Sequence, residues 1–380
     1  MKKDKIADFI ILGGGCSGLS FVNQLIEKEI KKYSFIVIEK KKKYFDDKSW
    51  CFWEKNNKEF ENIIEKSWDS FSFNLKGKTN FLASNQYKYY YIRSINFYKS
   101  IIDKILNCSH ISLKLGETIK DIIRYKSYYK VITCKNIYLS KNILDTRPNI
   151  NVFKKKPFMY QTFIGYEIKI LKKIRLDQSN AYIMHNMHID SNNFYFEYIL
   201  PLKNDVFLFE LTAFSNKKIS FKIIEHKLKK ILSTYLHNSY KLIRKEYGII
   251  PMGFVDTKLI KNYKNYYVSG SLAGSIRPSS GYAFLDIQKW ANESTNNLKK
   301  YGNLNILNKS EYIKYYLDKI FLKVISSNIT MAPKIFYHFS KNIIPNTFIR
   351  FMLGRANIID YIKVIYSMPK RIFLKCLIKN

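Results

Sequence analysis

Residues 9–39 read FIILGGGCSGLSFVNQLIEKEIKKYSFIVIE, and this stretch decides the fold that the sequence predicts. The apolar run 9–12 is typical of a short buried strand, and the similar run 35–38 ends at the acidic residue Glu39. Between the two runs, residues 17 to about 28 place apolar side chains at helical spacing, namely Leu19, Val22, Leu25 and Ile26. The order strand, helix, strand predicts the first unit of an α/β domain.

Three glycines join the first strand to the helix with the spacing G-x-G-x-x-G. Gly13 permits a tight turn, Gly15 lets backbone N–H groups approach a pyrophosphate, and Gly18 lets the helix pack closely on the strand. The helix N-terminus favours phosphate, and Glu39, 21 residues after Gly18, is placed to accept hydrogen bonds from a ribose. The sequence therefore predicts a Rossmann-type dinucleotide site, and a glycine-rich turn without a ligand is the less favoured alternative.

The strongly positive net charge of the chain is compatible with nucleic acid or an anionic membrane surface as a partner. Among 380 residues, 65 are Lys or Arg and 30 are Asp or Glu, which gives a net charge of +35. Only nine of the cations are Arg, although Arg suits bidentate phosphate and base recognition better than Lys. Because Lys, Ile, Asn, Tyr and Phe are abundant, as in proteins of AT-rich genomes, we favour compositional drift over nucleic-acid binding. Weak attraction to an anionic membrane surface is an expected consequence.

The cysteine pattern indicates a reducing compartment. Five cysteines without a C-x-x-C pair fit neither a disulfide framework nor a zinc site. His185 and His188 are three residues apart in a predicted strand, where this spacing does not align metal ligands, so no metal is expected. Without room for a signal peptide or a run of 18 apolar residues, we expect a cytoplasmic protein, soluble or peripheral to a membrane. The cysteines are Cys16, Cys51, Cys108, Cys134 and Cys376.

The segment 46–54, DDKSWCFWE, contains three large aromatic residues within four positions. Trp50, Phe52 and Trp53 are rare in a loop, and two interpretations carry equal weight. They form either a small aromatic core or one wall of a substrate site.

Charged residues also stand at the ends of two predicted elements. Arg93 precedes an amphipathic helix over 95–106, where its side chain binds either a cofactor phosphate, an acidic group or a surface partner. Asp145 and Arg147 follow the buried strand 142–144. In an open α/β sheet this strand end faces the ligand crevice.

A second glycine-rich stretch, GSLAGSIRPSSGYAF at 270–284, leads into a predicted helix from 281 to about 298. Gly270, Gly274 and Gly281 surround Pro278 in this stretch. It is predicted to bring another helix N-terminus to the same cofactor.

Alternating, aromatic-rich runs from residue 161 to 215 predict an antiparallel sheet and a second domain. Glu197 and Glu210 interrupt otherwise apolar strands, and Glu210 is the more exceptional because Phe209 and Leu211 flank it. A buried, unpaired carboxyl group has a raised pKa and is a candidate acid. The alternative is a Glu that faces solvent, which the alternation alone favours.

Several stretches together resemble the lycopene cyclase family of carotenoid biosynthesis. The glycine motif fits any flavoprotein of the glutathione-reductase-like, hydroxylase type, whereas SWCFWE, FELT and PSSGYAF in this order are more particular to the cyclases. The resemblance extends over nearly the whole chain. Its segments are GGGCSG with Glu39, DDKSWCFWE (46–54), LDTRP (144–148), QTFIG (161–165), FEYILPL with FLFELTAFS (196–215), YGIIPMG (247–253) and the glycine-rich stretch 270–284.

The resemblance implies an FAD enzyme that needs the reduced flavin, with NAD(P)H as the electron source, although the reaction is an isomerisation. A proton adds to the terminal double bond of lycopene, the cation is attacked by the C5–C6 double bond, and proton loss leaves a β-ionone ring. The implied acid is Glu210. Leu211 stands where the family often has a second acid, and His185 where many cyclases have Asp. These departures leave open the final base and the number of rings closed.

The resemblance also implies the architecture and the partners. A C40 carotenoid reaches the enzyme at a membrane surface, where contact with other carotenoid enzymes is an open expectation. A redox flavoenzyme of the same fold, a hydroxylase or a prenyl reductase, is the alternative function. The expected regions are a Rossmann-type FAD-binding domain (1–55, 86–150, 245–300), an antiparallel-sheet substrate domain (56–85, 151–244) and C-terminal helices that complete the substrate tunnel (301–380).

Overall fold

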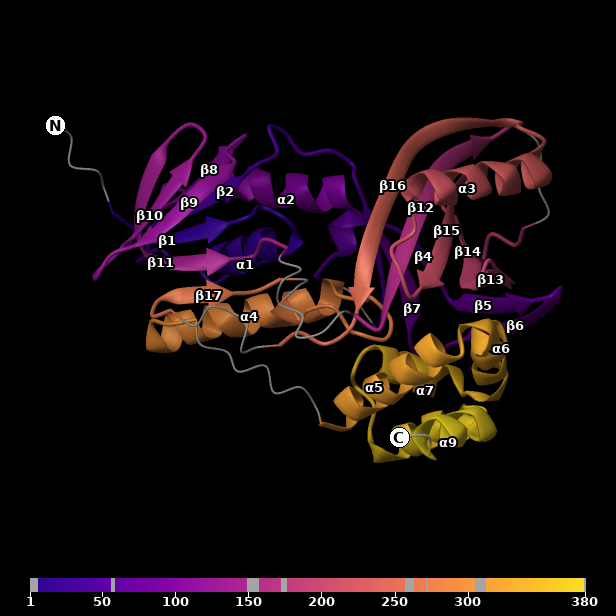
Figure 1. Cartoon of the computed structure of the whole chain (residues 1–380). Coiled ribbons are helices and arrows are strands. Elements are labelled where there is room, and N and C mark those ends of the chain that lie inside the picture. Colours follow the sequence, from indigo (N-terminus) through magenta and orange to yellow (C-terminus); the bar gives the residue numbers. More distant parts are fainter. Residues whose placement is uncertain are drawn as a thin grey trace.

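The computed structural model describes residues 6–55, 59–148, 157–171, 176–256, 263–270, 273–304 and 312–378. Two sheet-based units lie side by side, and a group of C-terminal helices packs below the second unit (Figure 1).

Seven strands in the described part of the chain form the first sheet: β1 (Ala7–Leu12), β2 (Phe35–Glu39), β8 (Ile111–Leu115), β9 (Ile119–Arg124), β10 (Tyr129–Thr133), β11 (Ile137–Asp145) and β17 (Tyr266–Val268). The strand order is β8-β2-β1-β11-β10-β9, with β17 parallel to the end of β11. The pairs within β8-β2-β1-β11 are parallel, whereas β9, β10 and β11 form an antiparallel meander.

Three helices share an apolar core with this sheet: α1 (Cys16–Glu27), α2 (Ser94–Leu106) and α4 (Phe284–Tyr301). Helix α1 presents Leu19, Val22 and Leu25 to this core, which are the residues that the helical spacing predicted. The parallel strands and their helices confirm the predicted α/β class.

The second sheet is mainly antiparallel, and in the described residues it has the order β16 (Tyr240–Met252), β12 (Met159–Ile170), β15 (Val206–Ser215), β14 (Asn193–Pro201), β13 (Asn180–Asp190), β5 (Ser70–Leu75), β6 (Lys78–Ala83). Helix α3 (Phe221–Leu236) covers one face of this sheet with the apolar side chains Ile224, Leu228 and Leu232. The other face looks toward the C-terminal helices (Figure 1).

A small sheet of β3 (Ser49–Glu54), β7 (Lys88–Arg93) and β4 (Ile64–Trp68) connects the two units. The C-terminal helices are α5 (Tyr312–Ser327), α6 (Ala332–Asn342), α7 (Pro345–Met352), α8 (Ile358–Ser367) and α9 (Lys370–Ile378). Helix α6 packs on β5, β6 and β13, and the C-terminal helices share one aromatic core with this sheet.

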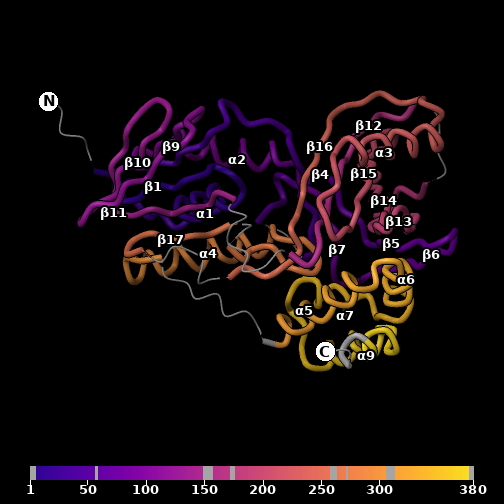
Figure 2. The backbone as a smooth tube through the Cα atoms, viewed as in Figure 1, coloured from indigo at the N-terminus to yellow at the C-terminus, as the bar shows by residue number. Residues whose placement is uncertain are grey.

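The chain crosses between the units several times (Figure 2). Strand β16 pairs with β12 as far as Met252, so residues 245–252 lie in the antiparallel sheet rather than with the first unit, to which the sequence analysis assigned them. The remaining domain division stays a prediction.

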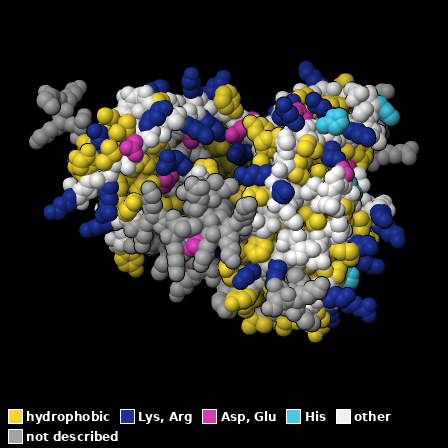
Figure 3. Space-filling view, in the orientation of Figure 1, with side chains coloured by type: hydrophobic (Ala, Val, Ile, Leu, Met, Phe, Trp, Pro, Cys, Tyr) yellow, Lys and Arg dark blue, Asp and Glu magenta, His cyan; other side chains and the backbone are white. Residues whose placement is uncertain are grey.

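Lysine and arginine side chains are spread over the face seen in Figure 3 rather than gathered into one patch. None of the described helices has both the length and the hydropathy needed to cross a lipid bilayer.

Candidate active site

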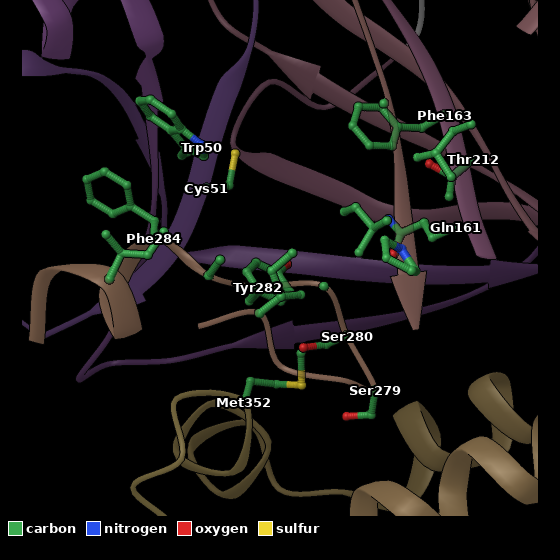
Figure 4. A pocket seen from close by; sticks show the side chains of 18 of the residues that line it. Trp50, Cys51, Gln161, Phe163, Thr212, Ser279, Ser280, Tyr282, Phe284 and Met352 are labelled. Carbon is green, nitrogen blue, oxygen red and sulfur yellow. The ribbon is translucent and has the colours of Figure 1, made fainter. Parts of the chain in front are cut away.

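A cavity of about 1710 Å³ extends from the glycine-rich turn after β1 to the C-terminal helices. Pockets for drug-sized ligands usually enclose about 300–1,000 Å³, so this cavity is large enough for more than one small molecule. Its lining comes from both main sheets, the small sheet, the loop before α4 and the C-terminal helices. Figure 4 shows the part that the second sheet, β3, the loop before α4 and α7 contribute.

The glycine-rich turn has the geometry that its spacing predicted. Gly13 has φ +97°, and its N–H donates to the Ile38 carbonyl at 2.8 Å. A Cβ added at Gly18 would lie 2.1 Å from the Gly13 carbonyl oxygen, whereas one added at Gly15 would meet no atom within 4 Å. Gly18 therefore permits close packing, and Gly15 leaves backbone open to the cavity at the N-terminus of α1.

Glu39 lies at the same end of the cavity. Its carboxylate accepts hydrogen bonds from the backbone N–H groups of Gly14 at 2.8 Å and Lys41 at 2.9 Å. Each oxygen keeps a further lone pair that a ribose hydroxyl can use. Asp145 and Arg147 line the cavity beside this turn, as predicted for the end of β11, and they form a bidentate pair at 2.7 and 2.9 Å.

The second glycine-rich stretch reaches the cavity only in part. Gly281 lines the cavity, but Gly270, Gly274 and Pro278 are not among the lining residues. Gly270 instead has φ +103°, and an added Cβ would lie 3.0 Å from the carbonyl oxygen of Thr146, so it serves the packing of two loops.

Three polar atoms of the cavity lining lack hydrogen-bond partners among the described residues. They are Nε1 of Trp53, Oε1 of Gln161 and Oγ of Ser280, and the last two side chains are labelled in Figure 4. Because buried polar groups are nearly always satisfied, these atoms indicate a ligand that carries hydrogen-bonding groups. Together with the glycine-rich turn and Glu39, they fit a dinucleotide whose far end reaches the second sheet.

Arg93 does not reach the cavity, contrary to the prediction that it binds the cofactor. Its guanidinium forms ion pairs with Glu65 at 3.2 Å, with Asp46 at 3.5 Å and with Glu167. These acids come from segments far apart in the sequence, so the guanidinium is already occupied by protein groups.

The aromatic residues of β3 are partly in the cavity wall and partly in an aromatic core, the two positions that the sequence analysis considered. Trp50 and Trp53 line the cavity, and the ring of Trp50 stacks on Phe284 with centroids 5.5 Å apart. Phe52 is not among the lining residues, and its ring packs in the core between Phe60 and Phe284. The expectation of substrate contact is therefore wrong for Phe52.

Glu210 on β15 faces the cavity rather than the outer surface. Its carboxyl accepts a hydrogen bond from Thr212 Oγ1 at 2.6 Å. Burial, and secondly repulsion by Glu246, raise the pKa of Glu210 to about 8, so the group is mainly a neutral acid at pH 7. The side chain of Leu211 points to the opposite face, into the core under α3.

A chain of phenols continues from Glu210 across the cavity. Tyr198 on β14 stands directly opposite Glu210, and its hydroxyl lies 2.7 Å from that of Tyr89, which lies 2.8 Å from that of Tyr282. Burial raises the pKa of each phenol, and it raises that of the neighbouring Cys51 thiol to about 12, so these groups stay neutral. The sequence analysis missed Tyr89 and Tyr198, although strand alternation places Tyr198 on the cavity side with Phe196.

His185 does not line the cavity, whereas the preceding residue Met184 does. Its ring packs against Tyr182, and burial lowers its pKa, so the imidazole is neutral at pH 7. The described residues contain no cluster of three His, Cys, Asp or Glu side chains placed to hold a metal ion.

Comparison with known proteins gives a family and a fold. A family model described as "Lycopene cyclase protein" matches residues 8–372. Comparison with curated proteins finds no match.

Solved structures of flavoproteins share the fold at low sequence identity. The flavoprotein/dehydrogenase from Cytophaga hutchinsonii has TM-score 0.63 and 10% identity, with 99% of this chain and all of that chain covered. The p-nitrophenol 4-monooxygenase PnpA from Pseudomonas putida DLL-E4 has TM-score 0.60 and 11% identity, with 98% of each chain covered. Halogenase PltM in complex with phloroglucinol and FAD has TM-score 0.57 and 9% identity, covering 91% of this chain and 80% of that chain. These likenesses confirm the predicted Rossmann-type fold of the hydroxylase type.

Proposed function

This chain belongs to the lycopene cyclase family, and we propose that it is a lycopene β-cyclase. It closes the ψ-ends of lycopene to β-ionone rings, giving γ-carotene and β-carotene, by an acid-initiated isomerisation without net redox change. The observation that carries this proposal is a neutral carboxyl group, Glu210, that faces an apolar cavity of about 1710 Å³. An acid of this kind can protonate an alkene only where water does not compete for the cation.

FAD is the proposed cofactor, used in reduced form with NAD(P)H as the reductant. Gly13 and Gly15 would hold its pyrophosphate at the N-terminus of α1, which Gly18 lets pack closely on β1, and Glu39 would hold its ribose. Gln161 and Ser280 offer unpaired polar atoms to the ring system. Reduced FAD, when bound, supplies negative charge that stabilises a nearby carbocation.

The residues of the chain then divide the work of the reaction. The Glu210 carboxyl donates its proton to the terminal double bond, and the C5–C6 double bond attacks the resulting cation. The faces of Trp53, Tyr198 and Tyr282 stabilise positive charge through their ring quadrupoles. Loss of one proton from the ring completes an isomerisation in which the numbers of protons and electrons are unchanged.

The far end of the cavity suits a long hydrocarbon. Its lining there comes from helices α5 to α9 and is mainly aromatic and aliphatic, with Phe321, Phe336, Phe348, Phe351 and Phe373. This region supports a C40 carotenoid as substrate, with one ψ-end at Glu210 and the polyene toward the C-terminal helices.

Helix α8 supports peripheral attachment of this cytoplasmic enzyme to an anionic bilayer. Ile358, Ile362 and Tyr366 are 71%, 48% and 67% exposed on one helical face, and Tyr366 also lines the mouth of the cavity. Exposed Lys363, Lys370, Arg371 and Lys375 stand beside this face and complement lipid phosphates. A hydrocarbon dissolved in the bilayer would thus enter at α8 and α9.

The test is pigment chromatography of lycopene-accumulating cells that express this chain. We expect lycopene to be converted to γ-carotene or β-carotene, and Glu210→Gln to abolish conversion while FAD remains bound. Glu197→Gln is the matched control, since this buried carboxyl lies on the opposite face of the same sheet, bonded to Asn186 and Tyr235. A fully active Glu210→Gln variant would overturn the assignment. Consumption of NAD(P)H in proportion to product would instead identify a redox flavoenzyme such as a hydroxylase or prenyl reductase.

A further inference from the structure

Glu210 has a second carboxylate beside it on the same face of the sheet. Gly165 on β12 pairs with Glu210 on β15 at one side and with Glu246 on β16 at the other. Residues directly opposite in neighbouring antiparallel strands point to the same face, so both carboxylates flank Gly165. A Cβ added at Gly165 would lie 3.0 Å from Glu246 Cγ, 3.2 Å from Leu208 Cδ1 and 3.4 Å from Glu210 Cβ, so both glutamate side chains lean over a glycine that has no side chain to separate them.

Glu246 is held firmly in this position. It is 3% exposed, and its two oxygens share the single hydroxyl proton of Ser49, whose Oγ lies 2.9 and 2.8 Å from them. Arg244 Nη1 donates to the same carboxylate at 2.8 Å. The side chain therefore cannot turn away from Gly165 without breaking its bonds to Ser49 on β3 and to Arg244 on its own strand.

Arg244 does not cancel the negative charge on this side of Glu210. It also binds Glu167 at 2.7 Å and Asp46 at 3.3 Å, and these acids share Arg93. With Glu65 included, these ion pairs join two guanidinium groups to four carboxylates, a net charge of −2. A negative cluster next to a buried carboxyl opposes its ionisation.

The other groups that face Glu210 carry no charge at neutral pH. They are Thr212 on its own strand, Tyr198 on β14, Cys51 on β3 and Tyr282 in the loop before α4. Glu246 and Arg244 on β16 are thus the charged groups that influence it among the described residues.

We propose that Glu246, acting across Gly165, is the positioning residue that keeps Glu210 in its neutral, proton-donating form. Glu246 lines the same cavity as Glu210, and the role proposed for it is exerted through Glu210. This inference rests on the proposed function for its role in cyclisation, but the link between the two carboxyl groups is a property of the protein alone.

The experiment measures Glu210 directly and then the reaction. The carbonyl-stretch band of protonated Glu210 is followed by infrared difference titration of the FAD-loaded protein, and Glu210→Gln assigns the band. From a wild-type pKa of about 8, Glu246→Gln is expected to lower the midpoint by about one unit. Activity at pH 8 then falls about fivefold, while activity at pH 6 stays nearly unchanged, because the protonated fraction drops only at high pH.

Three variants make the result decisive. Glu246→Asp is expected to restore most of the wild-type pH profile, and Glu197→Gln to leave it unchanged. Thermal unfolding and FAD content verify that Glu246→Gln is folded; if it is not, Ser49→Ala, which loosens Glu246 without removing its charge, is titrated instead and should shift the midpoint in the same direction. An unchanged Glu210 midpoint in a folded variant would overturn the inference. A shifted midpoint without any cyclisation would leave the inference standing and reject the proposed function.

Discussion

Separate replacement of Gly15 and Gly18 by alanine distinguishes a cofactor cradle from a tight turn that only serves folding. At Gly18 the new Cβ would lie 2.1 Å from the Gly13 carbonyl oxygen, at least 1.3 Å short of the 3.4 Å of ordinary contact. Both atoms belong to rigid backbone geometry, so α1 must move away from β1. We expect Gly18→Ala to lower the free energy of unfolding of the apo-protein by about 3 kcal/mol, the upper end of typical overpacking.

Gly15→Ala should behave differently. Gly15 has φ −81°, which alanine adopts without strain, and its added Cβ would meet no atom within 4 Å. The apo-protein should therefore lose only about 0.5 kcal/mol, the difference between glycine and alanine at a helix N-cap. The new methyl group does, however, occupy the space that the pyrophosphate needs, and we expect FAD affinity to fall by about tenfold or more.

Urea unfolding of the apo-protein and titration of flavin fluorescence measure the two effects separately. Each variant is the control for the other, because both change a glycine of the same turn by one methyl group. If Gly15→Ala bound FAD as tightly as the wild type, the open space at Gly15 would not be a phosphate site. If Gly15→Ala destabilised the apo-protein as much as Gly18→Ala, the steric reasoning itself would fail.

Two further predictions concern the C-terminal helices. Asp318→Asn should lower the free energy of unfolding, measured with urea, by about 3 kcal/mol, because it removes the charge that faces Arg277 at 2.9 Å in a pair whose side chains are 1% and 2% exposed. The control Asp69→Asn, which breaks an exposed pair with Lys88, should lower it by less than about 1 kcal/mol. Replacement of Ile358 and Ile362 together by Asp should lower the affinity for phosphatidylserine vesicles, measured by flotation, by about tenfold or more. Burial of each exposed isoleucine side chain in the bilayer contributes about 1 kcal/mol to binding. Ile243→Asp, on β16, is the control with similar exposure, and equal loss of flotation there would contradict a docking face on α8.

The sequence predicted the parts of the site that depend on local pattern. Gly13, Gly15 and Gly18 belong to one turn within a single βαβ unit, so their spacing along the sequence is enough to locate this turn. Glu210 was recognisable because a carboxylate between Phe209 and Leu211 conflicts with the apolar character of the strand. Local pattern left its direction open, and only the packing of the second sheet against the C-terminal helices turned that face into a cavity.

The parts that sequence reasoning missed depend on partners far away in the chain. Tyr89 meets Tyr198 across 109 residues and Tyr282 across 193 residues, and nothing in the local pattern of any one of them indicates the other two. Arg93 was assigned to the cofactor, with an acidic group as an alternative partner, and in the structure its partners are acidic groups. One of them, Glu167, lies 74 residues away on a strand whose register could not be read from the sequence.

The alternation of side chains along the strands explains where the two departures from the cyclase pattern, Leu211 and His185, lie. Leu211 follows Glu210 on the strand and therefore points away from the cavity, into the apolar core under α3. An acid at this position would be buried in that core and would not reach the cavity. His185 likewise lies outside the cavity lining, while its neighbour Met184 belongs to it. Neither departure removes an acid from the cavity side. The proposed acid, Glu210, is thus surrounded on the cavity side by Thr212, the three phenols, and Glu246 on the other side of Gly165.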